Sequence, residues 1–150
     1  MTLPKTPAQT VGPFYALGLC RRSDNELVGA DDPAALRLYG RLLDGAGDPI
    51  DGMIELWDAA DERWGRCGTD ADGRFEFVVP HNAHVLEAYV FARGLLKHQR
   101  TRIYLPGATD DVLESLAESE RTTLVAREED GALRFDIRMQ GEHATVFFAV

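Results

Sequence analysis

Residues that could bind a metal gather after the proline at position 80. His81 and His84 lie three residues apart, and Glu87 follows within an otherwise apolar stretch. Imidazole and carboxylate groups are common ligands of transition metals. On a β-strand, however, a spacing of three directs two side chains to opposite faces. A self-sufficient metalloenzyme that uses these residues is therefore one hypothesis, but the spacing argues against it. We expect solvated loop histidines, and we expect Glu87 to be paired, for example with an arginine.

Other chemical signatures are incomplete. No serine lies in a glycine elbow, and no glycine-rich phosphate loop is present. The segment 70–73 (DADG) resembles part of a calcium loop, but the third acid and the distal glutamate are missing, so we interpret it as a hairpin turn. Arg93 follows the apolar run 85–92. A cation at the end of a buried strand either extends to solvent or binds an anion.

The length, composition and net charge of the chain exclude several classes of protein. The 150 residues are 45% hydrophobic and 27% charged, which is typical of one globular domain. The net charge of −9 argues against nucleic-acid binding. No apolar run is long enough to cross a membrane, and residues 1–8 lack the apolar core of a signal peptide. We therefore expect a cytoplasmic protein in which Cys20 and Cys67 are reduced thiols.

The elements that must position these residues are mostly strands. Period-two alternation and turn residues predict strands over 36–42, 53–57, 74–79, 85–92, 99–105, 122–126, 133–139 and 145–150. Residues 58–63 are predicted to be a loop, and residues 110–120 a single short helix. We predict an all-β, antiparallel β-sandwich domain over residues 35–150, preceded by an extended N-terminal arm over residues 1–34.

Several segments, in order, resemble the intradiol ring-cleavage dioxygenases. They are the arm segment 6–15 (TPAQTVGPFY), the hairpin segments 47–59 and 69–77, and the segments 91–95 (FARGL), 101–104 and 134–141 (RFDIRMQG). The last three are most similar to the α-subunit family of protocatechuate 3,4-dioxygenase. Together these segments cover most of the chain.

The resemblance implies intradiol cleavage of protocatechuate by O₂, to 3-carboxy-cis,cis-muconate, with non-haem iron(III). In the heteromeric enzyme two tyrosines and two histidines of the β subunit bind the iron. Here the matching His-x-His positions fall on Val85 and Glu87, and His84 is one residue out of register. The stretches 58–68 and 79–83 are too short for the tyrosine-bearing loops. The resemblance therefore implies an α subunit with no catalytic or metal-binding residue of its own.

The resemblance also implies a contribution to the substrate pocket of the partner. Thr10, Gly12 and Pro13 match the Thr-x-Gly-Pro contact of the α arm, and Arg93 matches an arginine that shapes the pocket for the anionic substrate. A guanidinium suits a benzoate carboxylate because it offers two parallel donors. The expected partners are thus an iron-bearing β subunit, protocatechuate and O₂.

A second interpretation is a stand-alone binding module without catalytic activity. Transthyretin-like and carboxypeptidase-regulatory-like β-sandwiches contain hairpins similar to 47–52 and 69–73. Such a module needs neither the arm segment 6–15 nor the segment 91–95, so these two segments discriminate between the interpretations.

Overall fold

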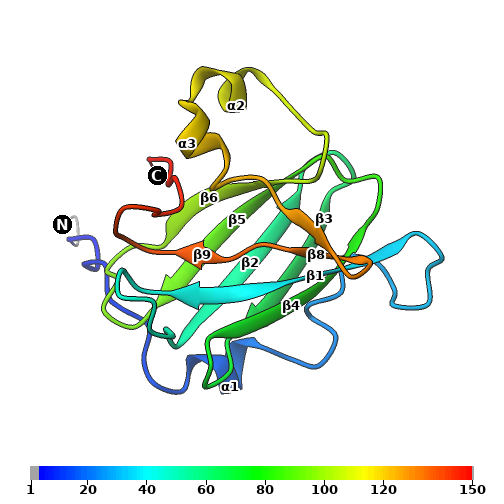
Figure 1. The fold of residues 1–150 in the computed structure, drawn as a ribbon. Coiled ribbons are helices and arrows are strands. Elements are labelled where there is room, and N and C mark those ends of the chain that lie inside the picture. The colour runs from blue at the N-terminus through cyan, green and yellow to red at the C-terminus, as the bar shows by residue number, and fades with distance from the viewer. Residues whose placement is uncertain (1–3, 150) are drawn as a thin grey trace.

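Two β-sheets face each other in the computed structural model, which describes residues 4–149 (Figure 1). The first sheet has the order β4-β1-β8-β7, and β9 also pairs with β1. Its strands are β1 (Ala35–Leu43), β4 (Arg74–Pro80), β7 (Arg127–Glu129), β8 (Ala132–Arg134) and β9 (Ile137–Arg138). The second sheet has the order β3-β2-β5-β6, with β2 (Gly52–Asp58), β3 (Arg63–Gly68), β5 (Val85–Ala92) and β6 (Gln99–Tyr104). All pairings are antiparallel except those of β1 with β8 and β9.

Alternate residues of both sheets form the core between the layers. Leu38 of β1 is opposite Phe77 of β4, and Ile54 of β2 is opposite Val90 of β5. All four are fully buried, and burial of each such side chain stabilises the fold by about 1.5–3 kcal/mol. The period-two pattern in the sequence follows from this arrangement, and the predicted all-β sandwich is confirmed.

The predicted strand 133–139 is interrupted between β8 and β9. Asp136 occupies the break, and its Oδ1 accepts a hydrogen bond from the Arg41 backbone N–H at 3.0 Å. A carboxylate thus replaces a backbone carbonyl in the pairing with β1. The chain runs so close to β1 at this point that a Cβ on Gly40 would lie 1.7 Å from the Phe135 carbonyl oxygen. Only glycine fits at position 40.

The prediction of one continuous helix over residues 110–120 was wrong. Two short helices occupy this region, α2 (Asp111–Ser115) and α3 (Glu118–Arg121), because Leu116 and Ala117 between them have extended backbones. Asp110 caps α2 by accepting a hydrogen bond from the Leu113 N–H. A further helix, α1 (Tyr15–Leu19), lies inside the arm, where none was expected.

Three further segments differ from prediction. Residues 63–68, beyond the predicted loop, form β3, which pairs with β2 along its whole length although it contains two glycines. Residues 122–126 form a turn with one bridge, between Tyr104 and Val125, because their backbone bonds mostly stay local to α3. Residues 145–149 make only one bridge, between Arg100 and Phe148, and residue 150 lies outside the described range.

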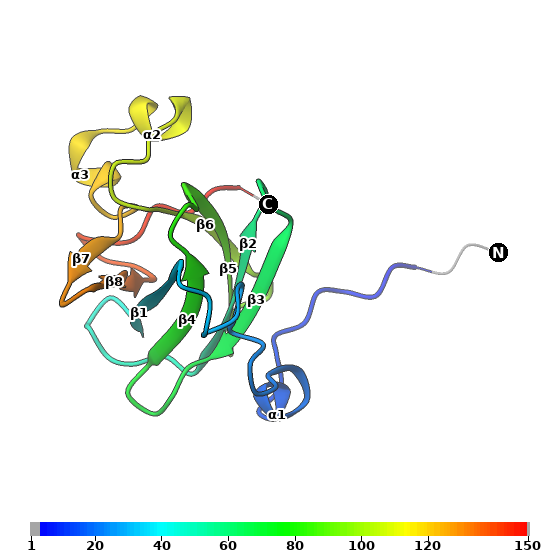
Figure 2. The same ribbon diagram turned by 90° about the vertical axis from the view of Figure 1, so that its right-hand side faces the viewer.

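The later part of the arm packs along the sandwich, whereas its first described residues project away from it. Leu27 is buried in the core and its N–H bonds the Val78 carbonyl at 2.8 Å. The first described residues project beyond the sandwich, past α1 (Figure 2). β1 begins at Ala35, and the division of the chain at residue 35 stays a prediction. None of the helices within residues 4–149 has the length and apolar character needed to cross a bilayer.

Candidate functional site

The Thr10 side chain connects the arm, through two hydrogen bonds, to the turn that contains Arg93. Its hydroxyl accepts a hydrogen bond from the Gly94 N–H at 2.7 Å and donates to the Ala92 carbonyl at 3.4 Å. Gly94 has a φ of +91°, a left-handed conformation that favours glycine and turns the chain immediately after Arg93. The side chain of Thr10 therefore bridges the two residues that flank Arg93, although the positions are more than eighty residues apart.

Tyr15 provides a second attachment of the arm. Its ring is buried, and its hydroxyl donates to Asp51 Oδ1 at 3.0 Å. Burial, together with the hydrogen bond to Asp51 and the charge of that carboxylate, raises the pKa of Tyr15, while the nearby charge of Arg93 opposes this shift. Tyr15 is thus held as a neutral phenol that connects α1 to the start of β2.

The exposed segment between these two attachments contains Gly12 and Pro13. The Gly12 carbonyl accepts a hydrogen bond from the Tyr15 N–H at 3.3 Å, which starts α1. No atom lies within 4 Å of where a Cβ on Gly12 would be, so this face of the arm is open. The structure brings Thr10 next to Arg93, and it holds Gly12 and Pro13 on the exposed connection beside them.

Arg93 is exposed and makes no salt bridge within the range 4–149. A hollow of about 300 Å³ lies alongside, between the arm and the β5–β6 turn. Val11 lines one side and Phe91, Leu95 and Leu96 line the other, together with the polar side chains Gln9, Lys97 and His98. Arg93 itself does not line the hollow. This end of the sandwich therefore carries an exposed cation, Arg93, in the same β5–β6 turn that borders a partly apolar hollow. A guanidinium is suited to bind a carboxylate.

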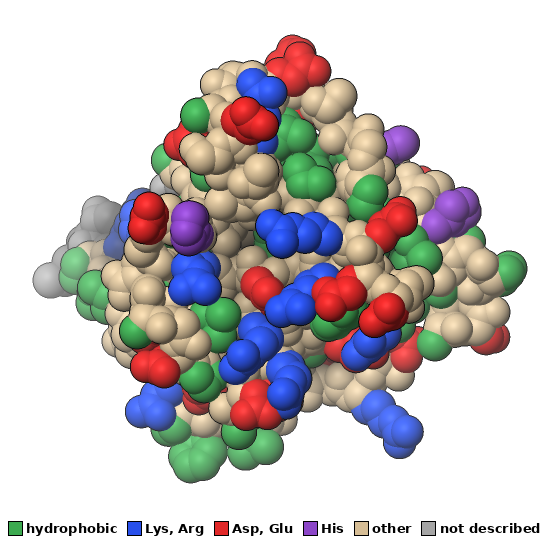
Figure 3. Space-filling model, in the orientation of Figure 1, with side chains coloured by type: hydrophobic (Ala, Val, Ile, Leu, Met, Phe, Trp, Pro, Cys, Tyr) green, Lys and Arg blue, Asp and Glu red, His purple; other side chains and the backbone are tan. Residues whose placement is uncertain are grey.

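Apolar side chains stay exposed on and beside the same arm. Phe14 is 72% exposed, Leu17 83% and Leu19 43%, and Trp64 of β3 is 42% exposed. Arg66 joins this region, because it stacks on Trp64 and donates to the Leu19 carbonyl. Figure 3 shows apolar side chains gathered along the lower edge, where α1 lies in Figure 1. A cluster of exposed apolar side chains is typical of a surface that another protein covers.

Glu87 is not available as a metal ligand. Its two carboxylate oxygens accept hydrogen bonds from Arg100 Nε at 2.8 Å and from Arg102 Nε at 2.9 Å. The expectation that an arginine pairs with Glu87 is confirmed, and the cluster contains two. His81 and His84 are exposed nearby. The hypothesis of a metalloenzyme built on His81, His84 and Glu87 therefore has no geometric support.

The charge cluster extends from Glu87 to the cap of α2. Arg102 also contacts Asp110 at 3.1 Å, and the Tyr104 hydroxyl donates to Asp110 at 2.9 Å. Burial alone would raise the pKa of Asp110, but the hydrogen bonds from the Leu113 N–H and Tyr104, together with the charge of Arg102, lower it. The result is a network of alternating charge across the outer face of β5 and β6.

Cys20 and Cys67 are free thiols, as expected. Burial raises the pKa of both, so the protonated form is favoured. Cys20 belongs to the arm and approaches β3 close to Gly68. Cys20 thus packs between the arm and β3, whereas Cys67 packs against the hydrophobic core.

Comparison with curated proteins identifies the family to which the chain belongs. It is 32% identical to the protocatechuate 3,4-dioxygenase alpha chain of Burkholderia cepacia, over 99% of both chains. It is 33% identical to the alpha chain of the same enzyme from Pseudomonas putida, over 97% of this chain and 96% of that one. The chain belongs to the family of protocatechuate 3,4-dioxygenase alpha chains. The first alignment spans 195 positions against 150 residues here, so these relatives contain segments that this alpha chain lacks.

Solved structures agree on the fold of this alpha chain. The dioxygenase domain of a carbohydrate-binding fusion protein from Streptomyces sp. SirexAA-E matches 91% of the chain, with a TM-score of 0.58 and 17% identity. Hydroxyquinol 1,2-dioxygenase from Pseudomonas putida DLL-E4 matches 95% of it, with a TM-score of 0.55 and 16% identity. No general protein-family model matches the chain. The fold is that of the intradiol dioxygenases, and the chain is a subunit of an enzyme of this type.

The residues of this alpha chain do not fit the iron(III) of intradiol dioxygenases. Within residues 4–149, no three His, Cys, Asp or Glu side chains form a group that could hold a metal ion. The hydroxyls of Tyr15 and Tyr104 donate to carboxylates, and burial raises the pKa of both, which opposes a tyrosinate ligand. The His98 ring packs against Tyr89, with ring centroids 5.6 Å apart.

Sequence reasoning selected Thr10, Gly12, Pro13 and Arg93 but missed the attachment of Tyr15 to Asp51. These two residues are 36 positions apart, and nothing in the local pattern of either connects them. The available signal was the pair of aromatic side chains at positions 14 and 15, which a purely solvated arm would not need and which therefore indicates that the arm packs against this domain or a partner.

Proposed function

We propose that this chain is the iron-free α subunit of a protocatechuate 3,4-dioxygenase. It supports the O₂-dependent intradiol cleavage of protocatechuate to 3-carboxy-cis,cis-muconate at an iron(III) site carried by the β subunit. Membership of the alpha-chain family over nearly the full length supports this proposal. Two further observations support it: residues 4–149 contain no group of three His, Cys, Asp or Glu side chains that could hold a metal ion, and the hydroxyls of Tyr15 and Tyr104 donate to carboxylates.

The observation that carries the proposal is the bridge from Thr10 to both neighbours of Arg93. Because Thr10 holds the turn, the guanidinium of Arg93 is presented at the surface without an acidic partner among residues 4–149. In the assembled enzyme this guanidinium pairs with the carboxylate of protocatechuate. Gly12 and Pro13 line the same pocket through their exposed backbone, where a larger side chain would exclude the ring.

The partner in this proposal is the iron-bearing β subunit. It covers the exposed apolar side chains of the arm, Phe14 and Leu17, and closes the pocket around the substrate. Water is thereby excluded from the contact between Arg93 and the substrate carboxylate, which strengthens that contact. We keep the expectation that the assembled enzyme is cytoplasmic.

The test is co-expression of the tagged chain with a candidate iron-bearing β chain. We expect the two to co-purify, with a broad visible absorption band from tyrosinate bound to iron(III) and with O₂ uptake on protocatechuate. A colourless chain that purifies alone from this co-expression would contradict the proposed subunit role.

A substitution at Arg93 tests the substrate contact. Loss of one charge-assisted contact corresponds to about 1.5–3 kcal/mol, so Arg93→Ala is expected to raise KM for protocatechuate by roughly tenfold to a hundredfold. Iron content, absorption band and turnover of catechol, which lacks the carboxylate, stay the same. The matched control is Arg74→Ala, an exposed arginine of the first sheet. Unchanged KM and kcat in Arg93→Ala would exclude Arg93 from the pocket while leaving the subunit role intact.

A further inference from the structure

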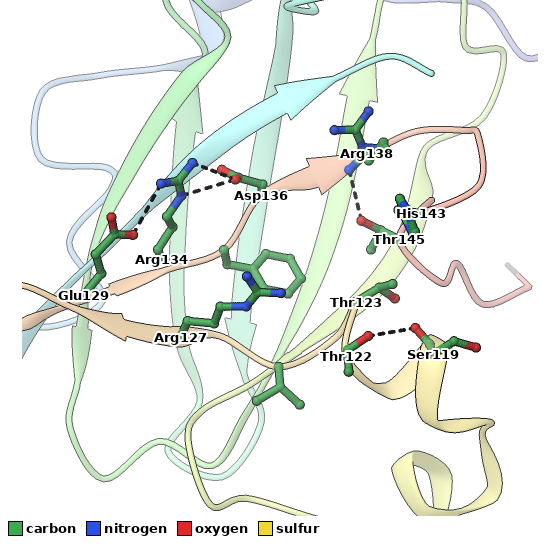
Figure 4. A pocket seen from close by; sticks show the side chains of 12 residues that line it. Ser119, Thr122, Thr123, Arg127, Glu129, Arg134, Asp136, Arg138, His143 and Thr145 are labelled. Carbon is green, nitrogen blue, oxygen red and sulfur yellow. Dashed lines mark hydrogen bonds and ion pairs between the residues drawn. The ribbon is translucent and has the colours of Figure 1, made fainter. Parts of the chain in front are cut away.

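A cavity of about 430 Å³ opens on the outer face of the first sheet, away from the arm (Figure 4). β7, β8 and β9 form one side, the end of α3 and the residues after it form another, and residues 143–145 close the third. Small-molecule sites in proteins have volumes of about 300–1,000 Å³, so this cavity is large enough for a small organic ligand.

Three arginines of the cavity differ in their partners. Arg134 is paired, because its guanidinium contacts Asp136 at 3.0 Å and Glu129 at 3.3 Å. Arg127 and Arg138, in contrast, make no ion pair with any acidic side chain of residues 4–149. In a chain with 25 acidic residues and 16 basic ones, two unneutralised guanidiniums in one cavity are unexpected. Figure 3 shows basic side chains over the centre of this face, with acidic side chains among them.

Hydrogen-bond donors of the cavity are also unused. Thr145 is only 4% exposed, and its Oγ1 accepts a hydrogen bond from the Arg138 backbone N–H at 3.0 Å. The hydroxyl proton of Thr145 has no acceptor among the described residues, so it is free to donate to a ligand oxygen. His143 lines the cavity next to Thr145 and offers a further N–H.

The wall of the cavity is not entirely polar. Phe135 and Val125 also line it. The Arg127 side chain extends from β7 toward the centre of the view in Figure 4. An inorganic anion uses only the donors, whereas a ligand with a carbon skeleton also covers the apolar wall. Arginine recognises carboxylates through two parallel hydrogen bonds.

We propose that this cavity binds a small organic di- or tricarboxylate, which pairs with Arg127 and Arg138 and accepts a hydrogen bond from Thr145. The proposal concerns this chain alone and does not depend on the proposed role as an α subunit. The cavity is separate from Thr10 and Arg93, because none of its lining residues belongs to the arm or to the β5–β6 turn.

The experiment is calorimetric titration of the purified full chain with benzene-1,3,5-tricarboxylate. Its neutral trimethyl ester and inorganic phosphate serve as comparison ligands. We expect saturable binding of the tricarboxylate, no binding of the ester and at least tenfold weaker binding of phosphate. Arg127→Gln is the principal variant, since the Arg127 side chain is exposed and forms no salt bridge within residues 4–149. It is expected to weaken tricarboxylate binding about tenfold.

The control variant is Arg74→Gln, which removes one charge from the same sheet outside this cavity and is expected to bind like the wild type. Equal weakening in both variants would mean that only net charge matters, and it would overturn the site. Absence of binding to the wild-type chain would overturn it as well. Phosphate binding as tight as that of the tricarboxylate would overturn the assignment to an organic ligand.

Discussion

The charge cluster around Glu87 permits a quantitative prediction about stability. We consider Glu87→Gln, which keeps the size of the side chain and removes its charge. The carboxylate is 15% exposed and contacts Arg100, 32% exposed, and Arg102, 20% exposed. A glutamine retains one oxygen acceptor, but its NH₂ group faces the other guanidinium, so one of the two hydrogen bonds is lost.

The expected cost follows from the burial of the cluster. A hydrogen bond to a charged group contributes about 1.5–3 kcal/mol, and breaking a partly buried ion pair leaves a cation without its counter-charge. Arg102 keeps Asp110 as a partner, which limits the loss. We therefore expect Glu87→Gln to lower the free energy of unfolding by about 2–3 kcal/mol.

Urea unfolding of the full chain, followed by tryptophan fluorescence, measures this difference. Trp57 lies directly opposite Glu87 in the pairing of β2 with β5 and reports on the site. The control is Glu76→Gln, which breaks the exposed pair with Arg37, whose side chains are 48% and 54% exposed. Exposed pairs contribute about 0–1 kcal/mol. A loss in Glu87→Gln no larger than in Glu76→Gln would refute the argument from burial.

Two further predictions concern the arm and the sheet. Tyr15→Phe removes the hydrogen bond to Asp51, worth about 1 kcal/mol, and is expected to speed tryptic cleavage of the arm about fivefold. Because the pKa of Tyr15 is raised in the folded chain, its contribution is complete below the ordinary tyrosine value and is lost as the pH rises through the folded value. An ultraviolet titration of Tyr15→Phe should therefore show one late-ionising tyrosine fewer than the wild type, whereas Tyr104, whose pKa is also raised, should still ionise late. Gly40→Ala places a Cβ against the Phe135 carbonyl and should cost more than about 3 kcal/mol, measured by thermal unfolding. Gly18→Ala, at a helical position with open space, should change stability by less than about 1 kcal/mol.

Strands with regular alternation could be predicted because their burial follows the same period as their sequence. In β4 and β5, every second residue faces the core, as the apolar positions indicate. β3 could not be predicted this way. Gly65 stands where an apolar side chain is expected, because Leu27 of the arm covers that position and a Cβ would lie 2.4 Å from its Cδ1. A contact with a segment far away in the sequence determines the residue there.

The same limit applies to the site. Thr10 and Arg93 were selected by their resemblance to a family pattern, and their roles in substrate binding stay predictions. The bridge from Thr10 to Ala92 and Gly94 is a tertiary contact that no local pattern reveals. An arginine partner of Glu87 could be predicted, because a carboxylate on an apolar strand requires a counter-charge. That two arginines share this carboxylate could not be predicted.

The ion cluster on the outer face of β5 has a consequence for metal binding at this strand. The single carboxylate of Glu87 pairs with two guanidiniums at once. A single change of Glu87 to histidine would leave Arg100 and Arg102 close together without that carboxylate, and both would repel an incoming metal cation. A metal site at this strand would therefore require changes of Arg100 and Arg102 as well as of Glu87, because one substitution alone leaves the local charge unfavourable to a cation.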